Sequence, residues 1–379
     1  MDLRSDDRKR EVLHGLVKRA LLVGVALLLC AGIAGGLLRV GIVVPGADGA
    51  AWLGRATTHH AALMICAFFG TVIGIERAVA VKLRVALLAP LASGLSGACL
   101  LLGEPGAGAW LGVVAALAFV GVNLVVVRRQ RAAHTLLLLA GALAWAVGSV
   151  LQVAGVGPAA PLPWWFAFLI LTIAAERLEM TRLMRQGPEV AFLLCAVLAT
   201  MLAGATWFAL SPARGGLLFG LSLVFLAAWL IVFDVARRTV RAHGLSRYMA
   251  VALLGGYAWL AVAGVAWIAM AYGWPARDIA LHALGLGFVV SMMMGHAPVI
   301  LPAIARVKLA FGPAFYAPLL ALHLSLLLRL GFGSDDFSLR AIGAVLNAAS
   351  IALFAATLAG AAAIRRMRQG AMPARRTTR

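Results

Sequence analysis

The chain has 379 residues, of which 63% are hydrophobic and only 12% are charged, and its mean hydropathy is +0.98. A water-soluble domain carries roughly 25% charged residues, so this composition excludes a soluble globular protein and predicts a membrane protein. The formal net charge of +19 would suit nucleic-acid binding only on a basic face of a water-soluble domain, which this sequence lacks. We therefore expect the lipid bilayer, and not nucleic acid, as the main partner of the chain.

Long apolar segments separated by short turns fill the sequence. A membrane-spanning helix needs about 20 apolar residues. On this criterion the sequence predicts an all-α fold with about twelve spans, at residues 20–42, 57–82, 84–103, 107–127, 132–156, 162–184, 190–211, 214–235, 248–273, 278–304, 313–332 and 340–364. The turns leave no room for a soluble domain, so we expect a single polytopic membrane domain over residues 1–379, with tails at 1–19 and 366–379.

Lysines and arginines are distributed unevenly between the two ends of these spans. With the N-terminus placed inside, 25 of the 33 fall in the tails and inner loops, five in the outer turns and three within spans. Because cytoplasmic loops carry an excess of Lys and Arg, this asymmetry predicts a multi-pass protein of the plasma (inner) membrane with both termini in the cytoplasm. Asp234, beside Arg237 and Arg238, is interpreted as a charge at a helix end.

Two predicted spans share a charged pair near their inner ends. The second span ends in GTVIGIERAVAV and the sixth contains LTIAAERLEM, so Glu76-Arg77 and Glu176-Arg177 follow an isoleucine at the same spacing. This faint repeat of four spans predicts three arcs of four helices, with spans two, six and ten equivalent. Ionisable residues inside spans indicate function, but arginines near an end also snorkel to the headgroups. Interfacial anchors and an inward-facing proton path or ligand shell both stay open.

Three of the predicted spans contain histidines that are candidates for metal or haem ligands. His60, with its neighbour His59, lies near the outer end of span two, and His282 lies at a similar depth in span ten. A neutral imidazole that faces a second ligand across a cavity can bind haem iron or copper, and this predicts an outer haem site from His60 and His282. His296 and His323, at a similar inner depth in spans ten and eleven, are candidates for a second site. For each histidine an interhelical hydrogen bond is the alternative.

The tenth span is the one most interrupted by polar and helix-breaking residues. It reads LHALGLGFVVSMMMGHAPVILPAIA and contains Pro298 and Pro302. Proline kinks a helix and frees backbone carbonyls, so His296 is predicted to lie at a break. With 3.6 residues per turn, the 14 residues from His282 to His296 place these two histidines on one face of the helix.

The histidine of span two and the tenth span, which opens with His-Ala-Leu and later reaches Gly-His, resemble the NnrS family of haem- and copper-containing membrane proteins. More distantly, the twelve spans are similar to the catalytic subunit of haem-copper oxidases and nitric oxide reductases. The resemblance implies haem b on His60 and His282, and copper as a further metal with His59 and His296 as candidate ligands. The chain departs from the oxidases because residues 162–211 contain no histidine, so a conventional oxygen-reducing centre is not expected.

Three functions compete for this sequence. The leading hypothesis is a b-type haem protein that acts in the nitric oxide or nitrogen-oxide response or in respiratory electron transfer, with quinone or a redox protein as partner. The second is a haem-free transporter of small solutes that uses the Glu-Arg pairs and the broken tenth helix. The repeats of such a transporter would be inverted. Glu76 and Glu176 lie in helices of the same direction, which argues against this hypothesis. The third is an assembly factor. No residue set identifies a reaction, so oxidoreductase-like activity stays open.

Overall fold

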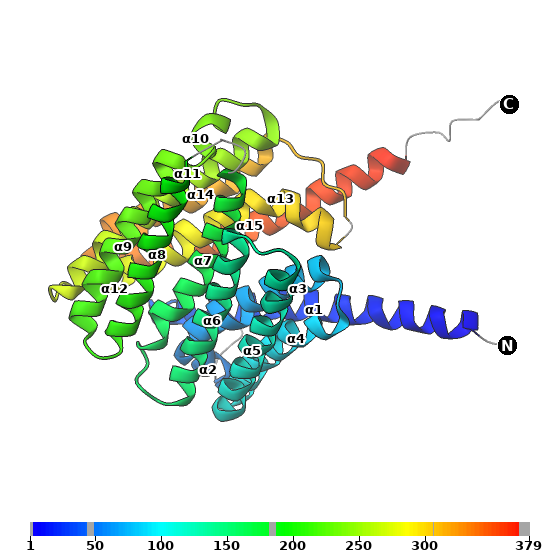
Figure 1. The fold of residues 1–379 in the computed structure, drawn as a ribbon, viewed down its shortest axis with the longest axis horizontal. Helices are drawn as coiled ribbons and strands as arrows, with labels where there is room; N and C mark the ends of the chain where they lie inside the picture. Colours follow the sequence, from blue (N-terminus) through cyan, green and yellow to red (C-terminus); the bar gives the residue numbers. More distant parts are fainter. Residues whose placement is uncertain (1–2, 44–48, 182–186, 306, 371–379) are drawn as a thin grey trace. The chain divides into compact units, whose positions relative to one another are not determined.

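The computed structural model describes residues 3–43, 49–181, 187–305 and 307–370, and all regular secondary structure in these ranges is helical (Figure 1). The chain divides into two compact units, residues 1–172 and 173–379, and each is described by itself. The three-arc grouping of the helices stays a prediction.

The predicted spans coincide with helices. Eleven helical segments of the described residues are long and apolar enough to cross a membrane. The remaining predicted span, the sixth (162–184), corresponds to α7 (Pro161–Thr181), which carries Glu176, Arg177 and Glu179 in its last turns and is less hydrophobic for that reason. The protein is therefore an all-α membrane protein with many spans, as its hydropathy predicts.

The first unit is a series of helices joined by short turns. Proline begins α5 because its fixed φ suits the first helical turn and its missing N–H has no partner there. Lys82 and Gly103 adopt left-handed conformations at the ends of α3 and α4. In chain order the elements are α1 (Leu3–Arg39), α2 (Ala51–Thr58), the π-helix η1 (Ala62–Phe69), α3 (Gly70–Val81), the 3-10 helix η2 (Arg84–Leu87), α4 (Leu88–Leu102), α5 (Pro105–Arg129), α6 (Ala133–Val153) and most of α7.

Aromatic rings form the centre of the first unit. Trp145 of α6 stacks on Phe168 of α7, with ring centroids 4.9 Å apart, and Phe119 of α5 packs edge-on against Trp145 at 5.6 Å. Gly70 of α3 lies against the same indole, where a Cβ atom would be only 2.7 Å from Cζ2. Because lipid tails are as apolar as these side chains, close packing of this kind, rather than exclusion from water, holds the helices together.

The second unit contains the remaining spans, and α8, α9 and α11 lie side by side in it (Figure 1). In chain order its elements after α7 are α8 (Pro188–Phe208), α9 (Pro212–Phe233), α10 (Ala236–Thr239), α11 (Gly244–Ala271), α12 (Arg277–His282), the π-helix η4 (Ala283–Val290), α13 (Ser291–Ala305), the 3-10 helix η5 (Pro313–Phe315), α14 (Tyr316–Leu326), the π-helix η6 (Leu327–Gly331), the 3-10 helix η7 (Phe332–Ser334) and α15 (Phe337–Gly370).

Glycines allow α9 and α11 to cross closely. A Cβ atom on Gly220 would lie 2.7 Å from the carbonyl oxygen of Gly264, and the converse distance is also 2.7 Å. Gly220→Ala is therefore expected to destabilise the protein by about 1–3 kcal/mol, because both backbones would have to move apart. Thermal unfolding of the detergent-solubilised protein, followed by circular dichroism, measures this loss.

Gly121→Ala is the matched control for this substitution. Gly121 lies in the middle of α5 and nothing would contact its Cβ atom within 4 Å. Because alanine favours the helix over glycine, this change is expected to be neutral or to stabilise by about 0.5–1 kcal/mol. Equal effects of the two substitutions would contradict the close crossing of α9 and α11.

Candidate functional site

A π-helix follows each of the two histidines predicted as outer haem ligands. His60 lies two residues before η1, and His282 is the last residue of α12, directly before η4. Both π-helices are eight residues long. Turns of this type are rare and often occur at functional sites. Spans two and ten thus share a His-Ala dipeptide and the same unusual backbone after it, which supports their predicted equivalence.

The imidazole of His60 is oriented by α1. Its Nδ1 lies 2.7 Å from the carbonyl oxygen of Gly32. Since a carbonyl only accepts, Nδ1 carries the proton and donates it, which makes Nε2 the basic nitrogen of the neutral ring. Gly36 leaves room for the ring, because a Cβ atom there would be 2.8 Å from Cε1. Metal-ligating histidines are commonly oriented by such a bond from the other ring nitrogen.

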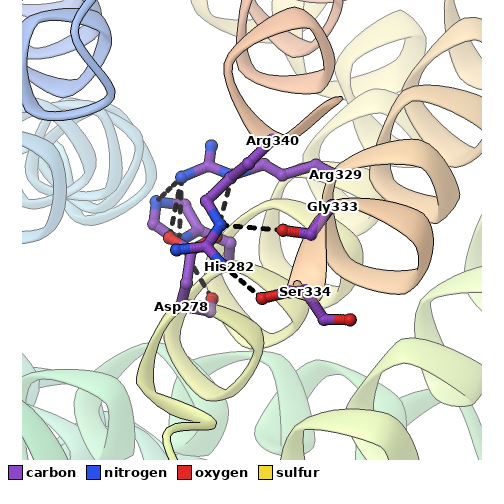
Figure 2. Close-up of polar contacts among 6 residues, drawn as sticks. All are labelled: Asp278, His282, Arg329, Gly333, Ser334 and Arg340. Carbon is purple, nitrogen blue, oxygen red and sulfur yellow. Dashed lines mark hydrogen bonds and ion pairs between the residues drawn. The ribbon is translucent and has the colours of Figure 1, made fainter. Parts of the chain in front are cut away.

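The imidazole of His282 belongs to a half-buried cluster with Asp278 and Arg329 (Figure 2). Nδ1 of His282 lies 2.9 Å from Oδ1 of Asp278 and 3.0 Å from its backbone oxygen, so it donates to Asp278. Arg329 donates from Nε and Nη2 to the two carboxylate oxygens of Asp278, at 3.1 and 2.9 Å. This fork-like ion pair fixes the carboxylate that in turn orients the imidazole.

The guanidinium of Arg329 also lies over the imidazole of His282. Its Nη2 is 3.4 Å from Nδ1 and 3.1 Å from Nε2 of the ring. An atom this close to both nitrogens lies above the ring face, because a position along either lone pair would be much farther from the other nitrogen. Arg340 closes the turn beside the cluster by donating to the backbone oxygens of Gly333 and Ser334 (Figure 2).

Asp278 and Arg329 are the residues of this cluster that sequence reasoning missed. Asp278 and His282 have the i, i+4 spacing that places side chains together on a helix. Arg329 is an arginine within a predicted span, a position that by itself indicates function. These signals were present in the sequence, but only the fold brings η6 against α12, 47 residues away from His282 along the chain.

Both ring nitrogens of His296, a predicted ligand of a second site, have hydrogen-bond partners in the structure. Its Nδ1 donates to the backbone oxygen of Met292 at 2.7 Å, and its Nε2 lies 2.8 Å from Nη2 of Arg177. A guanidinium only donates, so the lone pair of Nε2 is directed at Arg177. His296 is therefore an interhelical hydrogen-bond partner in this arrangement, the alternative considered from the sequence.

His323, the other predicted ligand of a second site, has a hydrogen-bond partner at Nδ1. Trp259 donates from Nε1 to Nδ1 of His323 at 2.9 Å. Because Nδ1 accepts, the proton of the neutral ring lies on Nε2, which has no hydrogen-bond partner among the described residues. This nitrogen faces Gly255, where a Cβ atom would be 2.8 Å away. A neutral His323 thus has no lone pair on Nε2 for a metal.

The prediction that His282 and His296 share one helix face rested on a helix geometry that the structure does not have. It assumed 3.6 residues per turn throughout, whereas η4 lies between the two histidines. A π-helix has wider turns, so it changes the angle between residues before and after it. Pro298 and Pro302 do lie inside α13, as predicted, four positions apart.

Arg177 is not an interfacial anchor. It is only 4% exposed, and its Nη1 lies 4.0 Å from Oδ2 of Asp234, which is fully buried. The remaining residues of the two Glu-Arg pairs are half-buried, namely Glu176 of α7 and Glu76 and Arg77 of α3. For these three the choice between an anchor and an inward-facing role stays open.

His59 ends α2, where its backbone N–H donates to the carbonyl oxygen of Arg55 at 2.9 Å. Its side chain is half-buried, and burial lowers the pKa of the imidazole. Within the described ranges, no three or more His, Cys, Asp or Glu side chains are grouped to hold a metal ion. A copper role for His59 stays a prediction from the resemblance.

These features define the class of the protein, a polytopic all-helical membrane protein whose interior holds oriented histidines and paired charges. The family model described as Domain of unknown function (DUF8744) matches residues 18–363, and the chain belongs to this family. The match runs from α1 into α15 and includes both compact units. Comparison with curated proteins and with solved structures gave no match.

Proposed function

We propose that this protein is a b-type haem-binding membrane protein of the NnrS-like kind, with His282 as an axial ligand. The observation that supports it best is the cluster in which Asp278 accepts from Nδ1 of His282 while Arg329 fixes Asp278. A carboxylate in this position sets the tautomer, orients the ring and increases the basicity of Nε2, the atom that would bind iron.

The donor set suits the chemistry of a haem. Imidazole Nε2 is the usual axial ligand of a b-type haem. Arg329 is 7% exposed and lies next to the imidazole, so it would also offer a positive charge to a propionate group. A bound haem would supply redox and gas-binding chemistry. The chain itself would hold the ligand nitrogen deprotonated and oriented.

His60 is the second proposed ligand, and its own surroundings support it. Nδ1 donates to the carbonyl oxygen of Gly32, and the π-helix η1 follows as η4 follows His282. His60 and His282 thus share an Nδ1 that donates to an oxygen acceptor, the carbonyl of Gly32 for His60 and Asp278 for His282. Their pairing on one haem remains a prediction from the equivalent depth of spans two and ten.

The cellular role follows from the resemblance and the charge distribution. We propose that the protein acts in the nitric oxide or nitrogen-oxide response, or in respiratory electron transfer with quinone or a redox protein as partner. The excess of inner lysines and arginines supports the plasma membrane with both termini in the cytoplasm. Copper as a second metal rests on the family resemblance alone.

An absorption spectrum tests this proposal directly. The protein, purified in detergent after expression with sufficient haem, is expected to show a Soret band and the reduced spectrum of a b-type haem, in a constant ratio to protein. Addition of nitric oxide to the reduced form would then test gas binding. Protein that takes up no haem would contradict the proposal, and uptake of a solute by haem-free proteoliposomes would favour a transporter instead.

A further inference from the structure

A second polar cluster lies inside the second unit, formed by Arg177, Asp234, Tyr257 and His296. These residues come from α7, the turn after α9, α11 and α13, so four segments contribute to it. Arg177 is 4% exposed, and Asp234 and Tyr257 are fully buried. Charged and polar groups buried in this way require hydrogen-bond partners or a function that explains their presence.

Only part of the hydrogen-bonding capacity of this cluster is used. Arg177 donates from Nη2 to His296, and Oδ1 of Asp234 accepts from the backbone N–H of Ala236 at 2.7 Å. Three further buried atoms make no hydrogen bond of standard geometry within the described chain, namely Nε of Arg177, Oδ2 of Asp234 and the hydroxyl of Tyr257. Asp234 and Tyr257, which carry two of these three atoms, are fully buried residues.

The unpaired atoms belong to side chains that lie close together. Oδ2 of Asp234 is 4.0 Å from Nη1 of Arg177, too far for a strong hydrogen bond. The hydroxyl of Tyr257 lies beside both the carboxylate of Asp234 and the guanidinium of Arg177. A donor, an acceptor and a hydroxyl in one buried place can be satisfied together by an internal water molecule, which needs two to four polar partners.

We propose that this cluster is a proton-exchange site in which Asp234 takes up a proton from water held by Arg177 and Tyr257. In this step a water-borne proton binds to Oδ2, the carboxylate becomes a carboxylic acid, and the water molecule remains. Arg177 keeps its hydrogen bond to His296 in both states, so the positive charge stays in place. The proposal does not depend on haem binding at His282, and its test is independent of haem.

The surroundings of Asp234 support proton uptake. Burial raises the pKa of its carboxyl group above the ordinary value, against the opposing effects of Arg177, the Ala236 N–H, Tyr257 and His296. These are the groups that face it from α7, α10, α11 and α13. The raised pKa means that protonation occurs as the pH falls through a value above the usual range for aspartate, about 3.9.

Infrared difference spectroscopy of the reconstituted, haem-free protein tests the proposal. Lowering the pH is expected to produce a carboxylic acid C=O band with a component whose midpoint lies above the ordinary aspartate value. Asp234→Asn should remove this component. The matched control is Asp335→Asn, because Asp335 is exposed and the same substitution there should leave the component unchanged. A component that survives Asp234→Asn would overturn the proposal.

Two further variants test the site if Asp234→Asn does not fold. Arg177→Gln retains a donor for His296 but removes the charge near Asp234, and should raise the midpoint by roughly 1–3 pH units. Tyr257→Phe removes the hydroxyl beside the carboxylate and should also raise it. A midpoint that neither substitution moves, or a wild-type midpoint in the ordinary range, would show that the cluster is structural only.

Discussion

His282→Ala is expected to lower the haem content of the purified protein at least about tenfold, because the substitution removes the nitrogen that would bind iron. The ratio of Soret absorbance to protein, measured after purification under identical conditions, gives the effect. Asp278→Asn leaves the histidine in place but weakens its orientation. It should therefore weaken haem affinity by about 10–100-fold, and the purified protein should retain more haem than the His282→Ala variant does.

The other histidines supply the controls. His60→Ala tests the second proposed ligand and should also remove the spectrum of a haem with two histidine ligands. His323→Ala and His243→Ala should retain haem, since Nδ1 of His323 accepts from Trp259 and His243 is exposed before α11. A His282→Ala protein with full haem, or equal losses in all four variants, would contradict the assignment.

Asp278→Ala is expected to destabilise the haem-free protein by about 1–3 kcal/mol. The loss is smaller than for a fully buried ion pair, because the side chain of Asp278 is 28% exposed. The substitution leaves Arg329 as a buried guanidinium without its two carboxylate hydrogen bonds. It also removes the acceptor of Nδ1 of His282. Thermal unfolding of the detergent-solubilised protein without haem measures this loss separately from any effect on haem binding.

A double substitution separates the cost of the unpaired charge from the loss of packing. Replacing both members of the pair, Asp278→Leu with Arg329→Met, should recover much of the stability, because no unpaired charge is then left beside His282. Asp335→Ala, at an exposed site, should change stability by less than about 0.5 kcal/mol. A small effect of Asp278→Ala would show that Arg329 is well solvated without its partner.

Local patterns predicted the helices because each span is decided by its own residues. About 20 apolar residues suffice for a span, and Pro105, Pro188 and Pro212 each begin a helix. The same local reasoning failed where the backbone departs from 3.6 residues per turn. The π-helix η4 was not predicted, and the shared face of His282 and His296 was inferred without it.

The roles of individual charges were harder to predict. Asp234 follows a long apolar helix and precedes Arg237 and Arg238, which suggested a charge at a helix end. In the structure its side chain is fully buried and faces Arg177 of α7. Two helices, α8 and α9, lie between these residues along the chain. Nothing in the neighbouring sequence distinguishes a carboxylate at a helix end from one folded back into the interior.

The sequence by itself determined that this is a polytopic helical membrane protein with intramembrane histidines, because hydropathy and residue type are properties of short segments. Only the tertiary structure decided which histidine has which partner. His282 meets Arg329, whereas His296 meets Arg177, 119 residues before it in the chain. These contacts depend on how distant helices pack and rotate against one another, and every apolar helix face allows several such packings. For that reason hydropathy could supply the candidate histidines, while hydrogen-bond geometry was needed to separate them.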